Sequence, residues 1–176
     1  MQKAVTKGPD DLQKQELEGQ MDFEQFGRMF RKAQSGLRQK ELVDIVRELP
    51  ENSTIHKILD VGCATGMLGL AVVGDNKDRT GVFFDRFPAQ LIKESAELTG
   101  LTDRAEVITG DFLKDDFGSG YDLIIGISIM LFAKGNMEML LKKFYDALNP
   151  GGVVLLISEG IDLENPSPQD IIMLRK

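Results

Sequence analysis

One short segment, residues 59–66 with the sequence LDVGCATG, constrains the fold of this chain more than any other. The apolar run before it has the length of a buried parallel strand, and the apolar run after it, residues 67–73, continues as a helix. Gly62 and Gly66 therefore lie in a strand-to-helix turn, where a missing Cβ lets the backbone approach a ligand and helix N-terminal amides face it. With Asp60 at the carboxyl end of the strand, the turn predicts a site for a ligand that has a nucleotide-like part.

The order of the elements around this turn indicates the fold class. Helical patterns at residues 89–98 and 136–148 alternate with short apolar runs that suit strands. The predicted strands are residues 55–59, 81–84, 105–108, 122–127 and 153–158. Strands that alternate with helices predict an α/β fold, a doubly wound and mainly parallel sheet of about five strands with helices on both faces.

Polar residues stand at the ends of successive predicted strands. Asp85 follows the second strand, about 20 residues past the turn, where doubly wound folds place an acid for ribose hydroxyls. Asp111 and Phe112 follow the third strand, and Ser128 follows the fourth. An acid at a strand end can also cap the next helix, and a phenylalanine there is more often core than ligand wall. The recurrence of acids favours binding, because the carboxyl ends of strands line the crevice of open α/β sheets.

These motifs together resemble the class I S-adenosylmethionine-dependent methyltransferases over residues 55–158. In that family the first strand carries an acid-x-Gly-x-Gly-x-Gly signature. Asp60, Gly62 and Gly66 match it, and Ala64 replaces the middle glycine. The turn Asn-Pro-Gly-Gly before the last predicted strand resembles the family's L-x-P-G-G signature. The stretch GDFLKDDFGSGYDLII looks most similar to small-molecule O-methyltransferases that carry a separate N-terminal dimerisation domain.

The resemblance implies a cofactor, S-adenosylmethionine, and a set of residues that hold it. This molecule needs amides for its carboxylate, carboxylates for its hydroxyls and an apolar slot for its adenine. Asp85 falls where the family holds the ribose hydroxyls, and Asp60 falls near the amino-acid end. Asp111 and Phe112 fall where the family contacts adenine. The predicted cofactor-binding residues are Asp60, Gly62, Gly66, Asp85, Asp111, Phe112 and Ser128.

The resemblance also implies a reaction, the transfer of a methyl group to a small-molecule acceptor, with oxygen as the accepting atom. Similar O-methyltransferases use a histidine just after the fourth strand. Residues 128–134 contain none, and the only histidine, His56, precedes the first strand, so no catalytic residue is assigned. The alternative function is a truncated or non-catalytic module that keeps the cofactor fold and acts through assembly. A nicotinamide dehydrogenase is disfavoured, because neither Tyr121 nor Tyr145 has a lysine four residues on.

The first fifty residues differ from the rest of the chain. Phe23, Phe26 and Phe30 recur at helical spacing, which predicts a helical N-terminal extension over residues 1–50. A cofactor-binding core follows over residues 51–176. An apolar stripe of this kind usually packs on the sheet, and the alternative is a lid over the cofactor or the acceptor.

The resembled family has further parts, a dimerisation domain and two last strands, that we expect this chain to lack. Residues 153–157 would then form an unpaired, strongly apolar sheet edge. Pairing with another chain, or cover by residues 171–174, would protect that edge. We therefore predict self-association, as a homodimer or through the exposed edge of the fifth strand.

Charge and composition narrow the expected partners. The formal net charge of -7 opposes binding to phosphate backbones, so nucleic acid is not an expected partner. The sequence has no signal peptide and no apolar run of membrane length, which predicts a soluble, cytoplasmic protein without membrane association. The single cysteine, Cys63, excludes an internal disulfide, and no metal-ligand cluster stands out.

Overall fold

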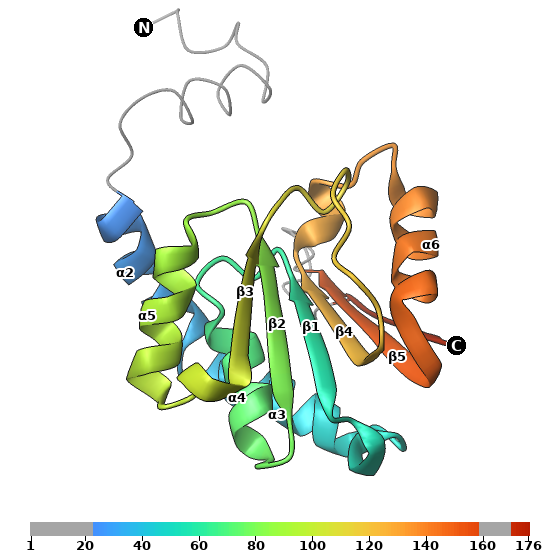
Figure 1. The fold of residues 1–176 in the computed structure, drawn as a ribbon, viewed down its shortest axis with the longest axis horizontal. Helices are drawn as coiled ribbons and strands as arrows, with labels where there is room; N and C mark the ends of the chain where they lie inside the picture. Colours follow the sequence, from blue (N-terminus) through green and yellow to red (C-terminus); the bar gives the residue numbers. More distant parts are fainter. Residues whose placement is uncertain (1–22, 159–169) are drawn as a thin grey trace, which may run out of the picture.

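The computed structural model describes residues 23–158 and 170–176, which contain a sheet of six strands in the order β3-β2-β1-β4-β5-β6 (Figure 1). The first five strands are parallel to one another, and β6 runs antiparallel to β5. The strands are β1 Lys57–Val61, β2 Thr80–Asp85, β3 Ala105–Thr109, β4 Tyr121–Ile127, β5 Leu148–Ser158 and β6 Asp170–Arg175. The predicted doubly wound, mainly parallel α/β fold is therefore confirmed.

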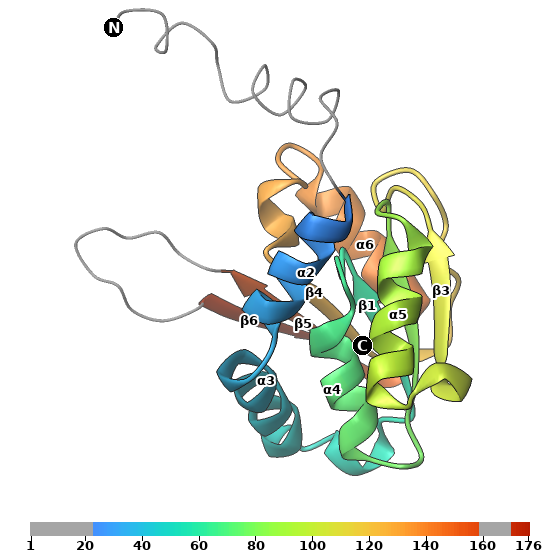
Figure 2. The same cartoon turned by 90° about the vertical axis from the view of Figure 1, so that its left-hand side faces the viewer.

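Helices cover both faces of this sheet. Helices α2 to α5 lie on one face and α6 lies on the other (Figures 1 and 2). The helices are α2 Phe23–Gln34, α3 Leu37–Glu48, α4 Met67–Asp75, α5 Ala89–Thr99 and α6 Met137–Ala147, with short 3₁₀ turns η1 Asn52–Thr54, η2 Thr102–Arg104 and η3 Ile129–Leu131. None of the helices in the described ranges is long and apolar enough to cross a membrane.

Burial on both faces explains why the central strands are nearly continuous apolar runs. In β1, Ile58 packs with α3 and α4 on one side of the sheet, whereas Leu59 and Val61 pack with α6 on the other. Helix α4 is apolar nearly all round because it lies between the sheet and neighbouring helices, and Leu70 and Val73 are fully buried.

The edge of β5 is covered within the chain. Strand β6 pairs along it from Val153 opposite Arg175 to Ser158 opposite Asp170. The sheet therefore has six strands rather than about five, and the prediction of an exposed fifth-strand edge is wrong because the C-terminal tail adds a strand there. Cover by residues 171–174, the alternative route, is what the structure shows.

Polar contacts fasten the end of β6 to the rest of the molecule. Arg175 Nε lies 2.6 Å from a carboxylate oxygen of Glu51, and Lys176 Nζ donates to the carbonyl of Leu148 at 2.8 Å. Residues 171–174 are apolar and remain exposed, so the outer side of β6 is the new apolar boundary of the sheet.

The N-terminal helices share the core of the sheet. Leu42 and Val46 of α3 are buried in the same apolar cluster as the residues of β1 and α4, as the stripe predicts. Met29 and Leu37 are exposed, so the apolar face is interrupted between α2 and α3. The side chains of Phe23 and Phe26 lie outside the described part, as do residues 1–22 and Glu159.

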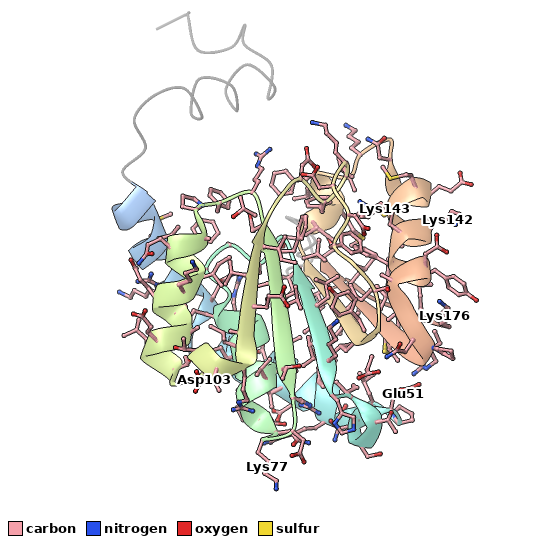
Figure 3. All side chains as sticks on the ribbon, in the orientation of Figure 1. Glu51, Lys77, Asp103, Lys142, Lys143 and Lys176 are labelled. Carbon is pink, nitrogen blue, oxygen red and sulfur yellow. The ribbon has the colours of Figure 1, made fainter. Side chains whose placement is uncertain are left out.

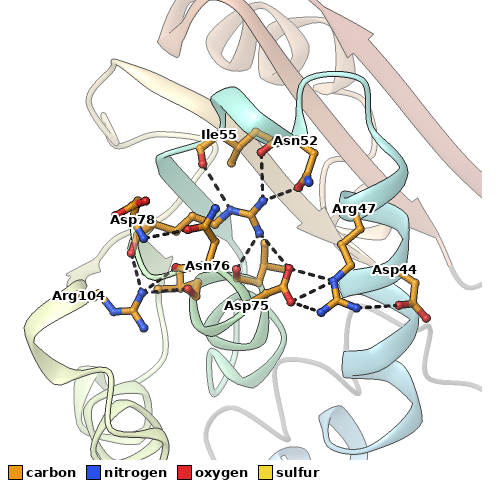
Figure 4. Close-up of polar contacts among 11 residues, drawn as sticks. Asp44, Arg47, Asn52, Ile55, Asp75, Asn76, Asp78 and Arg104 are labelled. Carbon is orange, nitrogen blue, oxygen red and sulfur yellow. Dashed lines mark hydrogen bonds and ion pairs between the residues drawn. The ribbon is translucent and has the colours of Figure 1, made fainter.

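A buried arginine, Arg79, directly precedes β2, and its partners Asn52, Ile55 and Asp75 are labelled in Figure 4. Arg79 is 1% exposed and donates to the carbonyls of Ile55 and Val72 and to both oxygens of Asn52. Asp75 lies 3.6 Å from the same guanidinium, and burial lowers the pKa of Arg79. One side chain thus satisfies three carbonyls, two from residues 52–55 and one from α4, at the end of the sheet opposite the predicted site.

Candidate cofactor site

The sheet register brings the predicted site residues to one edge. Val61 pairs with Phe84 of β2 and with Gly126 of β4, and Asp85 pairs with Thr109 of β3. The carboxyl ends of β1, β2, β3 and β4 consequently meet, in the upper part of Figure 1. In a doubly wound sheet this is the position of the ligand crevice.

In the glycine-rich turn after β1, every second residue from 62 to 66 has a backbone conformation in the left-handed region. Gly62, Ala64 and Gly66 have φ of 66°, 53° and 73°. The N–H of Gly62 donates to the carbonyl of Phe84 at 2.8 Å, which draws the turn toward β2. A Cβ at Gly62 would lie 2.6 Å from Ile129 Cγ2, so the glycine is required by packing as well as by φ.

Asp85 joins this turn to the end of β2. Its Oδ2 accepts a hydrogen bond from the N–H of Ala64 at 2.6 Å, and its Oδ1 accepts one from the N–H of Phe87 at 3.0 Å. The residue is 5% exposed, and burial raises the pKa of Asp85 against the effect of these donors. Gly110, at the end of β3, donates to the Asp85 carbonyl at 3.0 Å. The acid therefore lies at the junction of three strand ends.

Asp60 lies beneath the turn rather than in the open crevice. Its Oδ2 accepts a hydrogen bond from the N–H of Gly69 at 3.2 Å, which satisfies a donor in the first turn of α4. The residue is 3% exposed; burial raises the pKa of Asp60 to about 8, Asp85 adds to the rise and the Gly69 N–H opposes it. Asp60 thus supports the start of α4, and its side chain is not open to solvent.

The loop after β3 carries the predicted adenine contacts. Asp111 Oδ1 accepts a hydrogen bond from Leu113 N–H at 3.0 Å, and Lys114 Nζ lies 3.1 Å from Oδ2; both hold the pKa of Asp111 below its usual range. The ring atom Cε1 of Phe112 is 4.0 Å from the position of a Cβ built on Gly62, which brings the ring to the glycine-rich turn. Among the described residues, the N–H of Phe112 has no hydrogen-bond acceptor.

Ser128 begins the side of the crevice where an acceptor would lie. Its φ is 58°, and its N–H donates to the carbonyl of Ile157 at 2.8 Å, which fixes the exit from β4. Leu131 and Phe132 follow and are exposed. His56 lies at the other end of the sheet, where its backbone N–H donates to Asp122 at 3.0 Å.

Two residues at this site, Gln34 and Lys143, make contacts that have no counterpart in the sequence motifs. Gln34 of α2 accepts a hydrogen bond from the Thr65 hydroxyl at 2.6 Å and donates to the Cys63 carbonyl at 3.4 Å, so α2 supports the glycine-rich turn. Lys143 of α6 donates to the carbonyl of Phe112 at 2.7 Å. Both residues are more than 25 positions from their partners, and neither stands in a pattern that could have identified it.

These residues fit a cofactor with an adenosine part. Asp85 supplies a carboxylate beside the turn, and Phe112 supplies a ring together with a backbone N–H that has no partner in the described part. In the described ranges, no group of three or more His, Cys, Asp or Glu side chains is placed to hold a metal ion. This arrangement is typical of doubly wound proteins that bind a nucleoside cofactor across the carboxyl ends of the strands.

Comparison with known families narrows this class. Residues 59–154 match the sequence model of the methyltransferase domain, which is more than half of the chain. The chain therefore belongs to the methyltransferase-domain family and has the fold of the class I S-adenosylmethionine-dependent methyltransferases. The cofactor of this class is S-adenosylmethionine.

Individual relatives agree with the family. The carboxy-S-adenosyl-L-methionine synthase of Nautilia profundicola is 29% identical over 133 residues, which are 74% of this chain and 55% of that protein. The O-methyltransferase of a trans-AT PKS multienzyme of Brevibacillus brevis, solved with S-adenosyl-L-homocysteine, is 28% identical with a TM-score of 0.58, covering 68% of this chain and 40% of that one. The mitomycin 7-O-methyltransferase MmcR shares the fold, with a TM-score of 0.64 at 23% identity, over 80% of this chain and 43% of its own. The chain spans about half the length of the curated relatives it matches.

Proposed function

We propose that this protein transfers a methyl group from S-adenosylmethionine to an oxygen atom of a small-molecule acceptor. The observation that carries the proposal is the contact of the Asp85 carboxylate with the Ala64 N–H, at 2.6 Å, because it puts an acid at the end of β2 against the glycine-rich turn. The similar O-methyltransferases, one of them bound to S-adenosyl-L-homocysteine, support oxygen as the accepting atom.

Different residues of the site would bind different parts of the cofactor. Asp85 would accept hydrogen bonds from the ribose hydroxyls. Asp111, whose side chain is one-third exposed, would accept from the adenine amino group, and the N–H of Phe112 would donate to the ring. When bound, the cofactor supplies a methyl group activated by a positively charged sulfur. Alignment of that methyl group with the acceptor then carries most of the acceleration.

The residues that follow β4 favour an acceptor whose oxygen is already ionised or loses its proton easily. No histidine follows β4, and the ionisable side chain between β4 and α6 is Lys134. Exposed Leu131 and Phe132 offer apolar contacts beside the crevice. Phenols and carboxylic acids combine an apolar body with a hydroxyl of low pKa, so they need little help from a base. This class of acceptor fits the residues best.

A second candidate function is a binding or assembly module that retains the cofactor fold without catalysing the reaction. The observation in its favour is the distance of His56 from the crevice, since the chain's single histidine lies at the opposite end of the sheet. The two candidates share the cofactor site and differ only in turnover.

Calorimetry with S-adenosyl-L-homocysteine tests the cofactor site. We expect binding by the wild type and a 10- to 100-fold loss of affinity, roughly, in Asp85→Ala, because a buried carboxylate no longer meets the ribose hydroxyls. Asp103→Ala is the matched control, since Asp103 is an exposed acid of η2 at the far end of the sheet (Figure 3). An absence of heat with the folded wild type would overturn cofactor dependence in both candidate functions.

A turnover screen separates the enzyme from the module. The wild type is incubated with S-adenosylmethionine and, in separate arms, phenols, carboxylic acids and amines. Methylated phenol or carboxylate supports the proposal, and exclusive methylation of amines overturns the assignment of oxygen. Cofactor binding without product in any arm supports the module instead.

A further inference from the structure

One lysine of α6 reaches across to the loop that carries Asp111 and Phe112 (Figure 3). Lys143 Nζ donates hydrogen bonds to the carbonyl of Phe112 at 2.7 Å and to the carbonyl of Asp115 at 2.8 Å. The same ammonium lies 4.6 Å from the centre of the Phe117 ring. Two charge-assisted hydrogen bonds and a cation–π contact thus hold the side chain in one place.

The loop has local hydrogen bonds that shape it but do not orient it. The N–H groups of Lys114 and Asp115 donate to the carbonyl of Asp111 at 2.9 and 2.8 Å, and the N–H of Asp111 donates to Asp115 Oδ2 at 2.8 Å. These bonds join residues no more than four positions apart, so they form a compact turn, and Phe112 and Leu113 pack against the apolar cluster of the core. Lys143 is 31 residues from Phe112 and connects this turn to a helix of the core.

The adjacent lysine shows that this placement is specific to one position. Lys142 is 74% exposed and pairs with Asp146, one helical turn away, at 2.5 Å. Lys143 is partly buried, and burial lowers its pKa while Asp116, Asp115 and Asp111 act in the opposite direction. The two consecutive lysines therefore differ in environment: Lys142 faces solvent, and Lys143 contacts the loop.

We propose that Lys143 is a positioning residue that fixes the orientation of the loop at Asp111 and Phe112 and thereby sets the selectivity of the cofactor site for adenine. The inference rests on the proposed cofactor binding. Lys143 contacts backbone carbonyls of the loop, and the groups that would meet the base are the Asp111 carboxylate and the Phe112 N–H. Selectivity follows because a carboxylate accepts from the 6-amino group of adenine and repels the 6-oxo group of hypoxanthine.

The test uses Lys143→Met, which removes the ammonium and keeps an unbranched apolar side chain. Affinities for S-adenosyl-L-homocysteine and for S-inosyl-L-homocysteine, its 6-oxo analogue, are measured by calorimetry. We expect the wild type to prefer the adenine compound, and Lys143→Met to lose about tenfold in affinity for it and most of the preference. Lys142→Met is the matched control and should retain both.

A double-mutant cycle distinguishes positioning from a general structural effect. If Lys143 acts through the loop, Lys143→Met should add little to the loss of base preference that Asp111→Ala already causes. Lys143→Gln, which can still donate to one carbonyl, serves as the second variant if the methionine variant does not fold, and an intermediate preference is expected.

Three outcomes decide the inference. An unchanged base preference in folded Lys143→Met or Lys143→Gln overturns it while the proposed function stands. Additive losses in the double-mutant cycle also overturn it, because they make Lys143 independent of Asp111. No binding of S-adenosyl-L-homocysteine by the wild type overturns the proposed function and, with it, the inference.

Discussion

The carboxylate of Asp85 and the backbone N–H of Ala64 are joined by a 2.6 Å hydrogen bond across the turn that follows β1. Ala64 has a φ of 53°, a conformation that costs an L-residue about 1–2 kcal/mol. A buried acid therefore helps to hold the strained residue that replaces the family's middle glycine. Asp85 and the glycine-rich turn are therefore parts of one hydrogen-bonded unit.

We expect Ala64→Gly to raise the free energy of unfolding by about 1 kcal/mol, because glycine adopts a positive φ without steric cost. Urea denaturation measures the change. Gly100→Ala is the control of opposite sign: Gly100 has a φ of 68° with open space around its Cβ position, so alanine there should cost a similar amount. A destabilised Ala64→Gly variant would contradict the strain at this turn.

Asp60 should make stability depend on pH. The pKa of Asp60 is raised to about 8 from an ordinary value of 3.8, so the folded state binds the proton more tightly than the unfolded state. Its contribution to stability is fully present below about pH 4, falls as the pH rises and is gone above about pH 8. Asp60→Asn removes this titration, and its stability relative to wild type should increase by about 2 kcal/mol between pH 6 and pH 8.

Denaturation at a series of pH values checks this expectation. The carboxamide introduced by Asp60→Asn can keep the contact with the Gly69 N–H through its carbonyl oxygen, so the difference isolates the charge of the carboxylate. A stability difference that does not change between pH 6 and pH 8 would show that Asp60 has an ordinary pKa.

Loss of the buried arginine should destabilise the protein strongly. Arg79→Met leaves the carbonyls of Ile55 and Val72 and the oxygens of Asn52 without their donor, at a cost of about 3 kcal/mol. Lys77→Met is the control, because Lys77 is exposed on the same loop. Thermal unfolding of both variants gives the comparison, and equal midpoints would speak against the role of Arg79.

The outer edge of β6 should support self-association. Residues 171–174 are four consecutive apolar residues that remain exposed at the end of the sheet, and exposed apolar edges pair with other chains. We expect dimers or larger species in sedimentation velocity as the concentration rises. Ile172→Lys should weaken this self-association. Leu98→Lys, the same kind of change at an exposed leucine of α5, should not. A clean monomer at high concentration refutes the expectation.

The strands, and the positions of the candidate site residues at their ends, could be predicted because their signals are local. The runs at residues 81–84 and 105–108 lie within β2 Thr80–Asp85 and β3 Ala105–Thr109, since strands buried on both faces are continuously apolar. The positions of Gly62 and Asp85 follow from the turn and from the end of the next strand. The sequence does not predict the contact between Asp85 and the turn, nor the contact of Asp60 with the first turn of α4, because side-chain direction depends on packing.

The contacts of Gln34 and Lys143 could not be predicted for the same reason. Each joins a helix to a loop more than 25 residues away, and a glutamine or lysine on a helix is usually solvated. The sequence left two ways to cover the edge of β5, because a short apolar tail can pair within its own chain or with another chain. The structure shows the first, as strand β6.

The sequence by itself determined the class of fold, the family and the turn at residues 59–66, because hydrophobic periodicity and glycine spacing act over a few residues. Only the tertiary structure decided which strand covers β5, which way Asp60 faces and which helix holds the loop at Phe112. Those outcomes depend on hydrogen bonds and burial between segments far apart in the chain, and no local pattern records them.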